Sequence, residues 1–232
     1  KLQEENIKAT VIVASSLTTK DAETTIIAME RGAVDFVTKP GNLIEAKGDV
    51  FRGQLLGVMR AVLKIDSGVR RTISAGPSAA AAPATAVRKP IQRASLKNRA
   101  GGKKLIALAC STGGPKALQS VIPFLPAELN APIVLVQHMP RGFTKSMADR
   151  LNEISKVSVK EAEEGDVLQN GWVYVAPGGK HLEVARLSDG NHKVILTDKP
   201  AVNGLRPYAN YMYESLTTCT YDEIVCVVLT GM

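Results

Sequence analysis

Short apolar runs with almost no charge constrain this chain more than any other feature of its sequence. They occupy residues 9–14, 104–110, 132–136 and 224–229, and polar or turn-forming residues bound each of them. Runs of this length that are rich in Val, Ile and Leu are typical of buried strands. Strands buried on both faces occur in parallel sheets that helices cover, so we predict an α/β fold.

The first 70 residues alternate strand and helix patterns. Thr18, with Asp21 three residues later, resembles a capping box at the start of a helix. Residues 34–38 form a second strand pattern, and apolar residues at steps of three and four predict a helix over 51–65. A strand–helix–strand–helix order with short connections predicts parallel pairing.

The same alternation recurs from residue 103 onward. The strand at 104–110 enters the sequence Ser111-Thr-Gly-Gly-Pro115, where proline suits the first turn of a helix. The strand at 132–136 ends at Gln137-His138. We predict a doubly wound, mostly parallel α/β domain, with further strands at 171–175, 193–196 and 224–229 (the last fully buried) and a helix over 211–216.

Residues 71–102 separate these two parts and carry most of the net charge. The net charge of the chain is +7 at pH 7, and this stretch holds six basic residues, no acidic ones, three prolines and four consecutive alanines. Such a composition buries too little to offset its ordering entropy, so we expect a flexible linker. The alternative, a nucleic-acid or anionic-lipid arm, lacks aromatic residues for base stacking. The predicted domains are therefore 1–70 and 103–232, joined by the linker 71–102.

The cysteine content indicates a reducing, cytoplasmic setting. Three cysteines (Cys110, Cys219 and Cys226) form no CxxC pair, which argues against a disulfide scaffold or a zinc ribbon. No apolar run approaches the ~18 residues of a membrane helix, and residues 1–5 do not resemble a signal peptide. We expect no membrane insertion.

Ser111 and His138 are the strongest candidates for chemistry. Each follows an apolar strand, at the edge where open parallel sheets bind ligands. The helix after Ser111 presents N–H groups to an oxyanion, and a histidine with a pKa near neutrality can accept a hydroxyl proton. The pair predicts a nucleophilic serine with a histidine base.

Both residues also have simpler explanations. Ser111 could cap the helix that follows it, or its loop could cradle a phosphate. The loop lacks the Lys-Ser/Thr that would make it a Walker loop. His138 could be a hydrogen-bonded histidine at a strand end.

The remaining candidates are expected to be structural. His181 and His192 lie in polar, turn-rich sequence, so we expect them at the surface, and no two histidines share metal-ligand spacing. Cys110 and Cys226 lie in apolar runs, which favours a core position over a nucleophilic role. Arg206 precedes a helix and is expected to be an exposed structural arginine, with anion binding as the alternative.

Five motifs follow one another in the second part of the chain. They are ACSTGGP at 109–115, VQHMPRGFTK at 136–145, VYVAPGG at 173–179, VNGLRP at 202–207 and VLTGM at 228–232. Together they resemble the chemotaxis protein-glutamate methylesterases of the CheB type. In the first part, VIVASSLT at 11–18 and GAVDFVTKP at 32–40 resemble the second half of that family's response-regulator receiver domain.

The resemblance implies a two-domain hydrolase that phosphorylation regulates. Such an enzyme removes methyl esters from glutamates of chemoreceptors, releases methanol, and deamidates certain receptor glutamines. Its phosphodonor is the chemotaxis histidine kinase, and no nucleic acid takes part. The resemblance implies no cofactor for catalysis, and Mg²⁺ only in a complete receiver domain.

The resemblance also assigns roles to residues of the second part. Ser111 matches the nucleophile and His138 the general base, while backbone donors near Thr112 and Met232 face the oxyanion. The third triad member is an aspartate shortly after Met232, in a motif of which this chain holds only the beginning. We therefore expect the chain as given to be nearly inactive and poorly soluble.

In the first part, the resemblance points to a phosphorylation switch. Ser15 matches the hydroxyl residue that senses the phosphoryl group, Lys39 the lysine that pairs with it, and Phe36 the rotating aromatic. The phosphoacceptor and the magnesium-binding acids belong to strands ahead of Lys1. One rival class remains: a non-catalytic regulatory module that binds a phosphate-bearing effector at the Ser111 loop.

Overall fold

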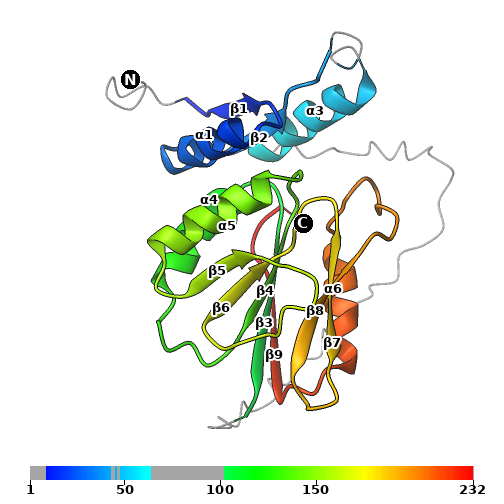
Figure 1. The fold of residues 1–232 in the computed structure, drawn as a ribbon. Helices are drawn as coiled ribbons and strands as arrows, with labels where there is room; N and C mark the ends of the chain where they lie inside the picture. Colours follow the sequence, from blue (N-terminus) through cyan, green and yellow to red (C-terminus); the bar gives the residue numbers. More distant parts are fainter. Residues whose placement is uncertain (1–8, 43–44, 46–47, 64–101, 232) are drawn as a thin grey trace, which may run out of the picture.

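The computed structural model describes residues 9–42, 45, 48–63 and 102–231. Its centre is a five-stranded sheet in the order β5-β6-β4-β3-β9, in which every neighbouring pair is parallel (Figure 1). These strands are β3 (Lys104–Cys110), β4 (Ile133–Gln137), β5 (Ser158–Glu161), β6 (Trp172–Val175) and β9 (Glu223–Val228). The mostly parallel α/β fold is confirmed.

Both faces of this sheet are covered. Helices α4 (Gly114–Val121), which a short 3₁₀ turn η1 (Ile122–Phe124) extends, and α5 (Phe143–Ile154) lie on one face. The antiparallel hairpin β7 (His181–Arg186) and β8 (His192–Thr197) lies on the other with α6 (Ala209–Ser215) and the 3₁₀ turn η2 (Leu216–Thr218). The central strands β3 and β4 therefore contribute side chains to two separate cores.

The N-terminal part has the predicted order of strand, helix, strand and helix. It consists of β1 (Ile12–Ser15), α1 (Thr19–Glu30), β2 (Asp35–Thr38) and α3 (Asp49–Leu63), and the two strands pair in parallel. Thr18 caps α1 as expected, because its hydroxyl accepts a hydrogen bond from the Asp21 N–H at 3.2 Å.

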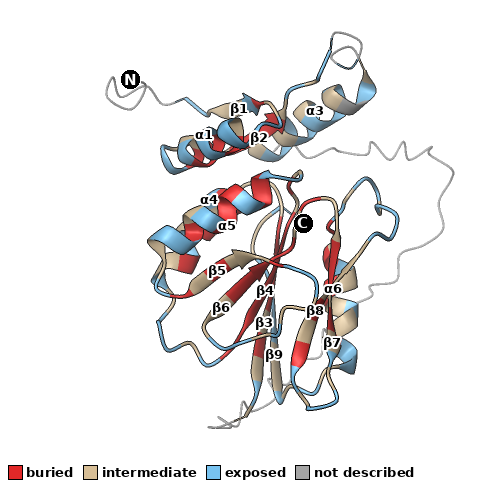
Figure 2. Cartoon of the chain, in the orientation of Figure 1, coloured by how far each residue is buried: buried red, intermediate tan, exposed pale blue. Residues whose placement is uncertain are grey.

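The N-terminal part shares a hydrophobic core with the rest of the chain. Ala22, Ile26 and Met29 of α1 are buried in the same cluster as Met147 and Leu151 of α5. This part lies next to α4 and α5, near the carboxyl ends of the strands (Figure 1), and Figure 2 marks the buried positions between the two parts. Burial of a side chain of the size of Ile26 or Met29 contributes about 1.5–3 kcal/mol, so this contact is substantial.

Two strands are less buried than predicted. The run at 224–229 forms β9 at the edge of the sheet, where Val225 and Val228 are 44% and 59% exposed and Cys226 is exposed too. The core position predicted for Cys226 is therefore wrong. Strand β1 is only half-buried because, within the described residues, it pairs with β2 alone.

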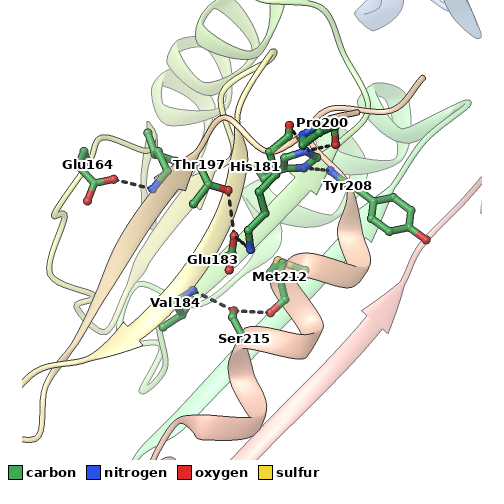
Figure 3. A network of polar contacts seen from close by, with 11 residues as sticks. Glu164, His181, Glu183, Val184, Thr197, Pro200, Tyr208, Met212 and Ser215 are labelled. Carbon is green, nitrogen blue, oxygen red and sulfur yellow. Dashed lines mark hydrogen bonds and ion pairs between the residues drawn. The ribbon is translucent and has the colours of Figure 1, made fainter. Parts of the chain in front are cut away.

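The surface positions predicted for His181 and His192 are wrong. His181 is fully buried: its Nδ1 accepts the Tyr208 N–H at 3.1 Å, and its Nε2 lies 3.2 Å from the Lys199 and Pro200 carbonyls (Figure 3). His192 is buried as well, and its Nε2 accepts the Thr220 N–H at 3.1 Å. Backbone groups pair with both ring nitrogens of His181 and with Nε2 of His192, which reduces the cost of burying these rings.

Some predictions fall outside the described residues. Of the linker at 71–102 only Gly102 is described, so its flexibility and the domain boundaries on either side stay predictions. Among the described helices, none is both long and apolar enough to cross a bilayer.

Candidate active site

Ser111 and His138 lie together, as the strand ends predicted. Cys110 of β3 pairs in register with Gln137 of β4, so the next residue of each strand emerges at the same edge. The His138 N–H donates to the Cys110 carbonyl at 3.2 Å, which joins the two strand ends. The Ser111 Oγ lies 3.0 Å from the His138 Nδ1, within reach for proton transfer.

Ser111 is not the cap of helix α4. The capping position belongs to Gly113, whose φ of 74° lies in the left-handed region that favours glycine. Pro115 stands in the first turn of the helix, as predicted. The hydroxyl of Ser111 is thus turned toward His138, and helix capping does not account for this serine.

The environment of His138 favours its neutral form. Burial lowers the pKa of His138, because the charged imidazolium loses solvation. If Nδ1 accepts the Ser111 hydroxyl proton, Nε2 must carry the hydrogen of the neutral ring. That Nε2 is buried and has no hydrogen-bond partner among the described residues.

This environment predicts a specific pH dependence. In the 232-residue chain, the rate at which a fluorophosphonate labels Ser111 should rise with pH through the pKa of His138, since only the neutral ring accepts the proton. Because burial holds that pKa below the ordinary value of about 6.5, labelling at pH 6.5 should already exceed half of its plateau.

A Cys110→Ser variant is the matched control and should show the same profile. A midpoint of the labelling profile above pH 6.5 in the 232-residue chain would contradict the proposed role of the buried ring.

The segment that follows β9 contacts the loop that holds Ser111. The Ser111 N–H donates to the Thr230 carbonyl at 3.0 Å, and the Thr230 hydroxyl donates to the Thr112 carbonyl at 2.9 Å. Gly231 has a φ of 70°, and a Cβ there would lie 2.4 Å from the Thr112 nitrogen, so only glycine fits. Met232 lies outside the described residues, and the oxyanion roles of Thr112 and Met232 stay predictions.

The N-terminal part reaches this site through β2. The buried Asp35 carboxylate accepts the Gly113 N–H at 3.3 Å, and desolvation raises the pKa of Asp35. Phe36 stacks on Phe143 of α5, with ring centroids 4.5 Å apart. Asp35 and Phe36, together with Ser111, His138, Pro140 and Leu205, line a cavity of about 290 Å³.

Ser15 and Lys39 also lie close together. The Lys39 N–H donates to the Ser15 carbonyl at 2.7 Å, and the Ser15 hydroxyl accepts the Thr25 hydroxyl at 2.7 Å. Lys39 lines a larger cavity of about 890 Å³ that Phe51 and Pro140 also border. The three predicted switch residues therefore lie on β1 (Ser15), on β2 (Phe36) and directly after β2 (Lys39), and Phe36 packs against Phe143 of the catalytic part.

Cys110 has the core position that the sequence predicted. It is fully buried, and burial raises the pKa of its thiol to about 12, so the reactive thiolate is disfavoured. The described residues contain no group of three or more His, Cys, Asp or Glu side chains arranged to hold a metal ion.

Two polar residues at the site were not predicted. Asp35 interrupts the apolar strand 34–38, and Gln137 is the last residue of β4, directly before His138. A polar side chain inside an apolar run was the only available signal, and it gave no indication of which groups these side chains would meet.

Comparison with known proteins identifies the family. Residues 106–232 match the family model described as CheB methylesterase, which covers more than half of the chain. The chain belongs to the CheB methylesterase family. The predicted resemblance is therefore confirmed.

Individual CheB relatives agree with this assignment. A protein-glutamate methylesterase/protein-glutamine glutaminase from Bacillus subtilis is 43% identical over 223 residues, which cover 96% of this chain and 61% of that protein. The counterpart from Pyrococcus horikoshii is 38% identical over 227 residues, covering 96% of this chain and 57% of that protein. This chain thus spans about three fifths of the length of these CheB proteins.

A CheB crystal structure supports the fold. The catalytic domain of the Thermotoga maritima CheB methylesterase matches with a TM-score of 0.53 and 40% sequence identity, covering 56% of this chain and 69% of that domain.

Proposed function

We propose that this chain contains the ester-hydrolysing centre of a protein-glutamate methylesterase and glutaminase that acts on chemoreceptors. The observation that carries the proposal is the 3.0 Å contact between the Ser111 Oγ and the His138 Nδ1 at the entry to helix α4. The names of the relatives supply the substrate class, a methylated or amidated glutamate side chain. A cytoplasmic setting is part of the same proposal.

The proposed reaction begins with proton transfer from Ser111. As the Ser111 Oγ attacks the ester carbonyl, its proton passes to the His138 Nδ1, and the N–H of Thr112 faces the developing oxyanion. The tetrahedral intermediate collapses when His138 returns the proton to the leaving methoxide, which departs as methanol. Water then attacks the acyl-serine by the same route and releases glutamate. With a glutamine substrate, ammonia leaves instead.

The unpaired Nε2 of His138 leaves room in this mechanism for a third group that accepts its hydrogen bond. Its buried N–H needs an acceptor, and a carboxylate there would stabilise the imidazolium that forms when Ser111 loses its proton. We propose that an aspartate after Met232 supplies this carboxylate. The Thr230-Gly231 segment leads the chain toward the nucleophile loop, in keeping with this proposal.

Methanol release from methylated receptor fragments tests this function. The full-length protein should release methanol, and a Ser111→Ala variant should not. The rival function, a regulatory module that binds a phosphate-bearing effector at the same loop, predicts nucleotide binding by calorimetry without methanol release.

We further propose that the N-terminal part is a receiver that regulates this centre on phosphorylation by a histidine kinase. Two contacts support occlusion of the site: the stack of Phe36 on Phe143, and the Asp35 carboxylate on the Gly113 N–H. Phosphorylation, sensed through Ser15 and Lys39, would shift the population from this closed arrangement toward an open one.

Loss of the aromatic stack should raise the basal activity. In the unphosphorylated full-length protein, Phe36→Ala should increase methanol release about fivefold, since an aromatic pair contributes ~1 kcal/mol to the closed state. Ile27→Ala removes an exposed apolar side chain of α1 and should leave the rate unchanged. An equal or lower rate for the Phe36 variant, with the protein folded, would count against occlusion.

A further inference from the structure

Gln137 is a buried polar residue that the proposed mechanism does not use. Its side chain is 2% exposed, and the alternation of β4 places it on the same face as Ile133 and Leu135, toward α4. The Gln137 Nε2 donates to the carbonyl of Ser111 at 3.0 Å and to the carbonyl of His138 at 3.2 Å. One amide group therefore holds the backbone of both the nucleophile and the base.

We propose that Gln137 is a positioning residue, which fixes the distance between Ser111 and His138 by tying together the carbonyls of the two strand ends. This inference rests on the proposed function, because it assigns a role within the same catalytic pair. Gln137 touches neither the substrate nor the reacting atoms and acts through the backbone of its two neighbours.

The orientation of the amide follows from its partners. Two carbonyl oxygens can only be satisfied by N–H donors, so the NH₂ end must face Ser111 and His138. The opposite end, Oε1, faces Gly114, where a Cβ would lie 1.9 Å from that oxygen. Gly114 thus admits the Gln137 side chain by having no side chain of its own.

The environment of Oε1 argues against a role in packing alone. This oxygen is buried and has no hydrogen-bond partner among the described residues. A methionine or leucine would fill the same space without burying this unpaired oxygen, but it would take the amide donor away from the His138 carbonyl. The unpaired Oε1 therefore costs stability, and the bonds that the amide makes to both residues explain its presence.

The other hydrogen bonds at the two strand ends involve each catalytic residue separately, so they do not replace the link that Gln137 makes. The His138 N–H donates to the carbonyl of Cys110, and the Ser111 N–H donates to the carbonyl of Thr230. The Ser111 carbonyl also accepts the Gly114 N–H at 2.8 Å, which belongs to the turn into α4. Among these bonds, the Gln137 amide is the side-chain link that reaches Ser111 and His138 together.

The test replaces Gln137 by methionine in the full-length protein. Gln137→Met keeps the side-chain length and removes both donors. It should lower kcat for methanol release by ~10–100-fold with KM little changed, because small displacements of reacting groups have effects of this size. The rate of fluorophosphonate labelling of Ser111 should fall by the same factor. Both rates are expressed per folded molecule, from thermal melting of each variant.

Gln119→Met is the matched control. Gln119 lies on α4, and its Nε2 is buried without a partner, so the same substitution there removes no link between Ser111 and His138. This variant should keep its kcat and its labelling rate within about twofold of the wild type.

Gln137→Glu tests the positioning role with a pH dependence that a purely structural role of Gln137 would not produce. Its ionised carboxylate would face two carbonyl oxygens and repel them, whereas its protonated form can donate one bond. The labelling rate relative to wild type at each pH, which cancels the titration of His138, should therefore recover as the pH is lowered. Gln137→Met should show no such recovery.

Two results would overturn the inference. One is a Gln137→Met variant that keeps wild-type kcat and labelling per folded molecule, and the other is a Gln137→Glu variant with no pH-dependent recovery. A wild type that labels at Ser111 without releasing methanol would contradict the proposed function, while the labelling rates would still decide the role of Gln137.

Discussion

Ser111→Ala in the full-length protein is expected to lower methanol release by about a millionfold, the size of loss that follows removal of a serine nucleophile. Ser111 places a hydroxyl 3.0 Å from the His138 Nδ1. Without the Oγ no acyl-enzyme forms, and only the oxyanion donors and substrate binding would leave a trace of activity. Measurement of methanol release over long times, with active-site labelling by a fluorophosphonate, checks both points.

Cys110→Ser is the matched control for this prediction. The neighbouring thiol is fully buried and its pKa is raised to about 12, so the variant should keep most of the activity. Labelling of Cys110 by a thiol reagent, with a parallel loss of turnover, would show that Cys110 and not Ser111 is the nucleophile.

His138→Ala should lower turnover by a similar factor of about a million, because the hydroxyl of Ser111 then has no base. The sharper expectation concerns the double variant. If Ser111 and His138 act as one unit, Ser111→Ala combined with His138→Ala should be no slower than either single variant.

Two outcomes would contradict this coupling. Additive losses in the double variant would show that the two side chains act independently. A His138→Ala variant that keeps its fluorophosphonate labelling would show that another group activates Ser111. Met139→Ala, a buried neighbour of His138 outside the catalytic pair, controls for simple loss of packing.

Local sequence patterns predicted much of the fold. Uncharged runs placed β3 and β4, the helical spacing of apolar residues placed α1 and α3, and Thr18 marked the start of α1. The short strands β5 and β7 were not predicted, because Ser158–Glu161 and His181–Arg186 mix polar and apolar residues without the long apolar run that marks a buried strand.

The sequence also predicted which residues form the candidate site. Ser111 and His138 each follow a strand, and parallel strands bring their carboxyl ends to one edge of a sheet. That rule needs no knowledge of the packing. It did not determine the Nδ1 geometry of His138, which depends on how the ring is buried.

The tertiary structure alone decided which polar groups meet across long separations in the chain. An apolar run looks the same at the centre of a sheet and at its edge, so the exposure of Val225 and Val228 in β9 followed only from strand order. His181 is buried because the backbone of Tyr208, Lys199 and Pro200 satisfies its ring.

The same reason applies to the contacts around Ser111. Asp35 bonds to Gly113 across 78 positions of the chain, and Gln137 to Ser111 across 26. Local propensity and periodicity describe each segment by itself, whereas these bonds depend on how segments pack. The sequence therefore predicted that Ser111 and His138 form a pair, and the tertiary structure determined which residues hold and cover that pair.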